Sequence, residues 1–160
     1  MTNPSPDTVF YLDASALVKR YVTETGSSWM AALCQPPTGN TIATARVTKA
    51  EAAAAFARKR RSGGLSQTHY TGILEDLLHD FMHQYLLVEI DEALVDLAVD
   101  LTRRHRLRGY DAVQLAAALT LNSLLSQAQL SPLTFVAADD DLLKAAEGEG
   151  LATDNPNRHP

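Results

Sequence analysis

The chain has 160 residues, 46% of them hydrophobic, and a formal net charge of −5, which suits a single domain whose ordered part we expect over about 8–154. Its single cysteine, Cys34, excludes an internal disulfide and a thiolate metal cluster, and it favours a reducing, cytoplasmic compartment. The N-terminal sequence MTNPSPDT lacks the basic segment of a secretory signal, and no stretch approaches the roughly 20 apolar residues of a membrane span.

The predicted elements alternate between strands and helices along the chain. Residues 9–12 are β-branched, aromatic or aliphatic, which is typical of a buried strand, and the next segment has apolar residues at helical spacing. We expect further strands at 41–43, 86–90, 133–137 and 151–153, and further helices at 24–35, 47–61, 66–85, 91–105, 111–125 and 139–147. The polar segment 155–160 is predicted to be a frayed tail. This alternation predicts an α/β fold with a small, mainly parallel sheet and helices on both faces.

Four carboxylates occupy comparable places in this pattern. Asp13 and Asp139 each follow a predicted strand and begin a helix, while Asp111 begins a helix after a glycine turn. Glu51 lies in the first turns of a helix, where its spacing from Thr48 is that of a capping box. For each residue alone, a helix cap is the better interpretation. Four together favour a shared site at the rim of the sheet, where α/β proteins bind ligands.

A group of carboxylates at one rim has a chemical consequence. The charges would repel one another and raise their pKa values unless a cation neutralised them. Oxygen ligands without cysteine or histidine suit Mg²⁺ or Mn²⁺. Such an ion can polarise a phosphoryl oxygen and generate hydroxide for in-line attack. We therefore predict phosphodiester hydrolysis that needs no protein nucleophile.

Four segments that contain these carboxylates resemble, in order, the successive motifs of the PIN-domain family: FYLDASALVKRY, VTKAEAAAAFAR, LRGYDAVQLAAAL and FVAADDDLLKAA. They are most similar to the VapC-type toxin ribonucleases of type II toxin–antitoxin pairs. The resemblance covers essentially the whole chain and implies a compact α/β/α sandwich with divalent-metal endoribonuclease activity. By this resemblance Asp13, Asp111 and Asp139 would hold Mg²⁺ or Mn²⁺. Glu51 would hold a second ion or orient the attacking water, and Ser15 matches the small hydroxyl residue after the first aspartate.

Two positions depart from the family pattern. The family often has Ser or Thr two residues before its last aspartate, and this chain has Ala137 there. The consecutive residues Asp139, Asp140 and Asp141 leave open which carboxylate faces the metal. We expect Asp139, because it follows the strand directly, with Asp141 as the alternative.

The resemblance also implies an RNA substrate and a cognate antitoxin, and we expect a homodimer. The basic residues expected to contact RNA phosphates lie just before Asp111: Arg103, Arg104, Arg106 and Arg108. A second basic run, 58–61, ends a helix, where cations complement the helix dipole. The antitoxin tail would place an Arg near Asp13 and Asp111. Its apolar side chains would fill a groove between the helix after Asp13 and the helix that carries Glu51.

Other interpretations stay open at this point. The chain could be a stand-alone PIN nuclease without an antitoxin, or a catalytically silent PIN-like binding module. A phosphoryl-transfer or receiver-type protein also places acids at strand ends, but a haloacid-dehalogenase-like hydrolase would have an aspartate where this chain has Ser15. His79 and His83 have the spacing of a helical zinc pair, yet the Glu of the H-E-x-x-H motif is missing, so we predict surface histidines.

Overall fold

In the computed structural model, which describes residues 8–160, the strands form one sheet in the order β3-β2-β1-β4-β5. Every pairing between neighbouring strands is parallel, as in the register that places Tyr11 of β1 beside Ala43 of β2 and Phe135 of β4. The strands are short: β1 Val9–Leu12, β2 Thr41–Ala45, β3 Leu86–Val88, β4 Thr134–Val136 and β5 Ala152–Asp154. The predicted small parallel sheet is therefore confirmed.

The strand order identifies where a ligand would bind. The chain passes from β1 to β2 and β3 on one side of the sheet, and then returns to place β4 and β5 on the other side of β1. In such sheets the crevice lies at the carboxyl ends of the two strands between which the order reverses. Those strands are β1 and β4, and the residues that follow them include Asp13 and Asp139.

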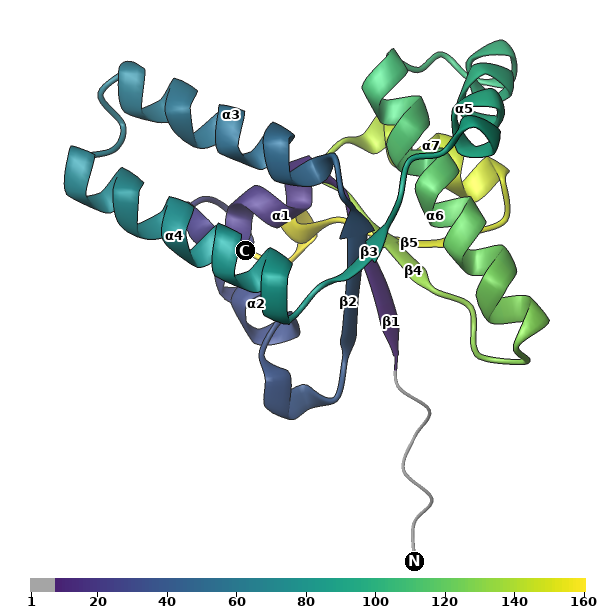
Figure 1. The fold of residues 1–160 in the computed structure, drawn as a ribbon, viewed down its shortest axis with the longest axis horizontal. Coiled ribbons are helices and arrows are strands. Elements are labelled where there is room, and N and C mark those ends of the chain that lie inside the picture. The colour runs from purple at the N-terminus through teal and green to yellow at the C-terminus, as the bar shows by residue number, and fades with distance from the viewer. Residues whose placement is uncertain (1–7) are drawn as a thin grey trace, which may run out of the picture.

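Helices cover both faces of the sheet, as the alternation predicted (Figure 1). On one face lie α1 Ala14–Tyr21, α2 Ser27–Leu33, α3 Thr48–Arg61 and α4 Gln67–His83. On the other lie α5 Glu92–Arg104, α6 Gly109–Gln127 and α7 Asp140–Gly148. Adjacent residues of β1 supply both cores, because Tyr11 packs under α5–α7 and stacks on Phe135, whereas Leu12 packs under α1–α4.

The C-terminal segment differs from its prediction. Residues 155–160 are packed and include the short 3₁₀ helix η2 Pro156–Arg158, which Asn155 caps by accepting a hydrogen bond from the Asn157 N–H. The ring of His159 stacks on Trp29 of α2 at 4.2 Å between centroids. Gly26 permits this approach, because a Cβ atom there would lie 2.3 Å from the Pro156 carbonyl oxygen. The prediction of a frayed tail was wrong, since these contacts come from residues far away in the sequence.

Two helix starts also differ from their predictions. The helix expected over 24–35 begins only at Ser27, because Gly26 at its N-cap has a left-handed backbone conformation. The helix expected to begin at Asp111 begins at Gly109, after Arg108 in an extended conformation. Asp111 is therefore a residue of the first turn of α6, where the helix dipole favours a carboxylate, and it is not the N-cap.

Two further expectations concern the ends of the chain and the membrane. The N-terminal residues 1–7, on which the argument against a secretory signal rests, lie outside the described residues. Among the residues that are described, no helix is both long enough and apolar enough to cross a membrane.

Candidate active site

A cavity of about 740 Å³ lies at the carboxyl ends of β1 and β4. All four predicted carboxylates line it, each from a different element: Asp13, Glu51, Asp111 and Asp139. Carboxylates as far apart in the sequence as Asp13 and Asp139 thus meet at the crevice that the strand order identifies. Whether these side chains act in catalysis stays a prediction, but the structure brings them into one cavity.

Asp13 is both a helix cap and a cavity residue. Its Oδ1 atom accepts a hydrogen bond from the Ala16 N–H at 3.0 Å, which caps α1. The Ser15 hydroxyl donates to both carboxylate oxygens, at 2.7 and 2.9 Å. Asp13 is only 4% exposed. The capping and site interpretations of Asp13 therefore do not exclude each other.

Ser15 connects the two strand ends that border the cavity. While its hydroxyl donates to Asp13, the same oxygen accepts the Ala138 N–H at 2.9 Å, between β4 and α7. The position where the family often has a hydroxyl residue, Ala137, is fully buried beside it. The bond from Ala138 to Ser15 thus fixes the backbone just before Asp139.

Gln114 is a site residue that the sequence analysis missed. It is 1% exposed, and its Oε1 atom accepts the Tyr11 hydroxyl at 2.6 Å. Its Nε2 atom donates to Thr48 Oγ1 and to Glu51 Oε1, both at 2.8 Å. The alternative interpretation of Thr48 and Glu51 as a capping box does not hold, because the N-cap of α3 is Val47 and no side chain caps it. Gln114 instead orients Glu51 toward the cavity.

A weak signal for Gln114 was present in the sequence. It lies three residues after Asp111, which is a spacing that places two side chains on neighbouring positions of one helix face. An amide at that position of an otherwise apolar helix needs buried partners. Its partners could not be named from the sequence, since Glu51 and Tyr11 lie 63 and 103 positions away.

Asp139 and Asp141 have different surroundings in the structure. Asp139 is the N-cap of α7, where its Oδ1 atom accepts the N–H groups of Asp141 and Leu142 at 2.9 and 3.2 Å. Asp139 lines the cavity of about 740 Å³ with the other three carboxylates. The side chain of Asp141 lines a neighbouring pocket instead. Asp139 is thus the residue of the triplet that shares the cavity.

Comparison with known proteins identifies the family. No family model matches the chain. It is 39% identical over 114 residues to "Ribonuclease VapC45" of Mycobacterium tuberculosis (strain CDC 1551 / Oshkosh). The aligned region covers 69% of this chain and 75% of that relative. The chain belongs to the VapC ribonuclease family. This confirms the resemblance drawn from the four motifs.

Solved structures share the fold of this VapC-family protein. The crystal structure of PAE2754 from Pyrobaculum aerophilum has a TM-score of 0.62 at 17% identity, over 96% of this chain and 94% of that one. The crystal structure of VapBC2 from Rickettsia felis bound to a DNA fragment from their promoter has a TM-score of 0.61 at 14% identity, over 92% and 98%. At these identities the likeness concerns the fold, which is the expected PIN-like α/β/α sandwich.

The cavity of this VapC-family protein holds interacting negative charges. The pKa of Asp13 is raised to about 7, chiefly by burial and also by the charges of Asp111 and Glu51, against the hydrogen bonds from Ser15 and Ala16. The pKa of Glu51 is raised by burial and by Asp111, although the Gln114 hydrogen bond opposes this. Burial and the charge of Asp139 raise the pKa of Asp111. The carboxylates therefore repel one another, as the sequence analysis anticipated.

The donor chemistry of the cavity fits a hydrated divalent ion. Among the described residues, no group of three His, Cys, Asp or Glu side chains is close enough to hold an ion by itself. Five carboxylates and the Ser15 hydroxyl line the cavity: the four predicted carboxylates and Glu24, which forms an ion pair with Lys19. Neither histidine nor cysteine is among the described residues that line it. Mg²⁺ keeps several waters and binds one or two carboxylates together with substrate phosphates. The residues present suit that mode and do not suit a site made of protein ligands alone.

The basic residues of the expected RNA contact separate into three groups. Arg108 lines the active-site cavity, and its charge opposes the rise in the pKa of Asp111. Arg106 and Arg104 line the neighbouring pocket, but Arg104 forms ion pairs with Asp100 and Glu149. Arg103 lines neither cavity.

Arg58 enters the active-site cavity from the end of α3, although its run was interpreted mainly as a dipole partner. His79 and His83 are exposed and stack on each other at 4.3 Å between centroids, which confirms that they are surface histidines.

Proposed function

We propose that this VapC-family protein is a divalent-metal-dependent endoribonuclease and the toxin of a toxin–antitoxin pair. The observation that carries the proposal is the meeting of four carboxylates from four elements in one cavity. They meet where the strand order of a parallel sheet reverses. The relative named as a ribonuclease supports RNA as the substrate. The cytoplasm is the compartment we propose, because Cys34 is a free, buried thiol.

The four carboxylates would have two roles in hydrolysis, which are to bind the metal ion and to orient the attacking water. Asp13, Asp111 and Asp139 would hold a hydrated Mg²⁺ or Mn²⁺ together with its waters and a substrate phosphate, and Glu51 would hold a second ion or orient the attacking water. When bound, the ion supplies Lewis-acid polarisation of the phosphate and lowers the pKa of a water molecule. Burial and the charge of Asp111 raise the pKa of Glu51, which favours proton uptake by its carboxylate, and Gln114 fixes the orientation of that carboxylate.

Hydrolysis then requires an acceptor for the proton of the attacking water and cleavage of one phosphorus–oxygen bond. The water oxygen forms a bond to phosphorus while its proton passes to Glu51. The phosphorus–oxygen bond to the leaving ribose breaks, and the leaving oxygen takes a proton from solvent. Arg58 and Arg108, which line the same cavity, offset the negative charge of the bound strand.

The cavity also supports the proposed antitoxin. Its wall continues from the carboxylates along Val18 of α1 and Ala55 of α3 into a groove between these helices. This is the groove expected for the apolar side chains of an antitoxin tail. An Arg on that tail would pair with the buried carboxylates, for which its planar guanidinium is suited.

We propose a homodimer as well. The exposed side chains of Val95, Val99 and Tyr110 form an apolar surface on α5 and α6 that is the candidate interface.

Cleavage assays test the nuclease proposal. The purified protein should cleave RNA with Mg²⁺ or Mn²⁺, stop in EDTA and recover when the ion is restored. Asp13→Asn, Asp111→Asn and Asp139→Asn should each abolish cleavage. Asp141→Asn is the matched control, because it makes the same change beside the cavity and should retain cleavage. Undiminished cleavage by a folded Asp13→Asn protein would overturn the assignment.

Co-expression tests the antitoxin proposal. The product of a neighbouring gene should co-purify with this protein as an inactive assembly. If the two proteins purify apart and cleavage persists in the mixture, the chain is a stand-alone PIN nuclease.

A further inference from the structure

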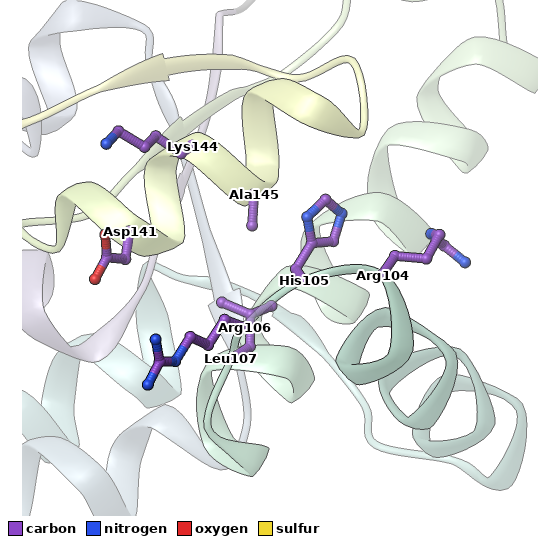
Figure 2. A pocket seen from close by; sticks show the side chains of 7 residues that line it. All are labelled: Arg104, His105, Arg106, Leu107, Asp141, Lys144 and Ala145. Carbon is purple, nitrogen blue, oxygen red and sulfur yellow. The ribbon is translucent and has the colours of Figure 1, made fainter.

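A second pocket of about 450 Å³ lies beside the candidate active site, between the segment that joins α5 to α6 and the helix α7 (Figure 2). The two cavities are lined by residues that are close neighbours in the sequence, both in the segment between α5 and α6 and at the start of α7. Arg106 lines the pocket and Arg108, two residues later, lines the active-site cavity. Asp141 lines the pocket and Asp139, two residues earlier, lines the active-site cavity. A strand of nucleic acid that leaves the carboxylates on this side would reach the pocket next.

The pocket has a rigid frame. The carboxylate of Glu149, at the end of α7, accepts a hydrogen bond from Arg104 at 2.6 Å and bonds His105 Nε2 at 2.8 Å. The Leu107 N–H donates to the His105 carbonyl at 3.0 Å and closes a tight turn at Arg106. The Leu107 side chain packs against the core. These contacts fix the α5–α6 segment against α7 and hold Arg106 at the rim.

Two cations in this frame take no part in holding the fold. Among residues 8–160, neither Arg106 nor Lys144 has a hydrogen-bond or ion-pair partner for its side chain, and both are exposed. Figure 2 shows the side chains of Arg106, Asp141 and Lys144 ending on the same side of the pocket, whereas Arg104 extends away from them. The pocket is therefore a concave surface with two cations available for a ligand.

The charges continue from one cavity to the other. Arg58 and Arg108 line the active-site cavity, and within the described chain their side chains also have no hydrogen-bond or ion-pair partner. Together with Arg106 and Lys144 they form a basic path past the carboxylates in a chain whose net charge is −5. Guanidinium groups bind phosphate oxygens through paired hydrogen bonds, and an ammonium group adds a point charge.

We propose that this pocket is a second phosphate-binding subsite, which holds a backbone phosphate of the RNA strand on the Asp139 side of the scissile phosphate. Arg106 and Lys144 bind the phosphate. The Asp141 carboxylate in the same pocket repels a doubly charged free phosphate more strongly than a singly charged diester, which favours a polynucleotide as the occupant. The inference rests on the proposed function, because it requires an RNA strand in the neighbouring cavity.

Binding measurements at several salt concentrations test the subsite. The probe is a fluorescein-labelled 12-nucleotide single-stranded RNA, and all proteins carry Asp13→Asn, so that the strand stays intact. Each phosphate contact to single-stranded nucleic acid contributes about 0.7 to the slope of log K against log salt concentration. Arg106→Gln and Lys144→Gln should each weaken binding and lower that slope, and the double variant, which leaves the subsite phosphate without a cation, should lower it by about 0.7.

Arg61→Gln is the matched control. Arg61 is exposed, has no partner among residues 8–160 and lines neither cavity, so its replacement should leave the slope unchanged. Equal losses in Arg61→Gln and Arg106→Gln would show diffuse electrostatic attraction and overturn the subsite. An unchanged slope in the double variant, with RNA cleavage intact in the wild-type protein, would overturn the subsite and leave the proposed function standing. A wild-type protein that neither binds nor cleaves RNA would overturn both.

Discussion

Neutralising Asp13 should stabilise the metal-free protein at neutral and alkaline pH. The Asp13→Asn substitution keeps the shape of the side chain and the oxygen that caps α1. It removes the ability to ionise in a site where burial and the charges of Asp111 and Glu51 oppose the carboxylate form. The substitution thus separates the electrostatic cost of the site from its packing.

The size of the effect follows from the pKa of Asp13. Its value is raised from 3.8 to about 7, and each pKa unit corresponds to about 1.4 kcal/mol, so the ionised carboxylate costs up to about 4 kcal/mol of folding free energy. Folding raises this pKa, so the native state binds more protons than the unfolded state between about pH 4 and pH 7. The free energy of unfolding contributed by Asp13 therefore falls as the pH rises through that window.

Urea unfolding in EDTA between pH 4 and pH 8.5 measures this contribution. Asp13→Asn should match the wild-type protein near pH 4 and exceed its stability by roughly 2 to 4 kcal/mol above pH 7.5. Asp91→Asn is the control, because Asp91 caps α5 through the same type of bond to Leu94 but is exposed. A gain that is absent at pH 8, or that does not shrink toward pH 4, would refute the electrostatic account of the cavity.

Two further predictions concern buried contacts. Gln114→Leu removes the acceptor of the Tyr11 O–H and the donor to Thr48 Oγ1, so it should lower the free energy of unfolding by about 2 kcal/mol or more in urea titrations, since each unsatisfied buried group costs about 1–3 kcal/mol; a neutral effect would contradict the role of Gln114. His159→Ala removes the ring stacked on Trp29, the single tryptophan of the chain. It should red-shift the fluorescence of Trp29 and cost about 0.5–1.5 kcal/mol, whereas an unchanged emission maximum would mean that the C-terminal segment does not pack in solution.

Local signals were sufficient to predict the strands and the α-helices, apart from some of their bounds, and to select the four carboxylates. For an aspartate that directly follows a strand, such as Asp13, the neighbouring residues are enough to predict its place at the strand end. Alternation of strands and helices then implies that the carboxyl ends of the strands share one edge. The strand order, which places β4 beside β1 and so joins Asp139 to Asp13, has no comparable local signal.

Contacts between distant residues account for what the sequence analysis missed. Thr48 and Glu51 have the spacing of a capping box, but the buried amide of Gln114 from α6 binds both side chains, and no local pattern shows which partners Gln114 has. The basic run likewise does not show that Arg104 pairs with Glu149, which lies 45 positions away, while Arg106 has no partner among residues 8–160. Which cations are available for a ligand is therefore a property of the folded chain.

Calorimetric titration of Mn²⁺ tests most directly whether the carboxylates form one metal site. The wild-type protein should bind Mn²⁺, and both Asp13→Asn and Asp111→Asn should weaken binding by at least about tenfold, the lower end of the loss when an outer-shell partner of a metal site is removed. Asp141→Asn should bind Mn²⁺ as the wild-type protein does, because Asp141 lines the neighbouring pocket. Mn²⁺ binding that is unchanged by Asp13→Asn and Asp111→Asn would contradict a shared site at the end of β1 and β4.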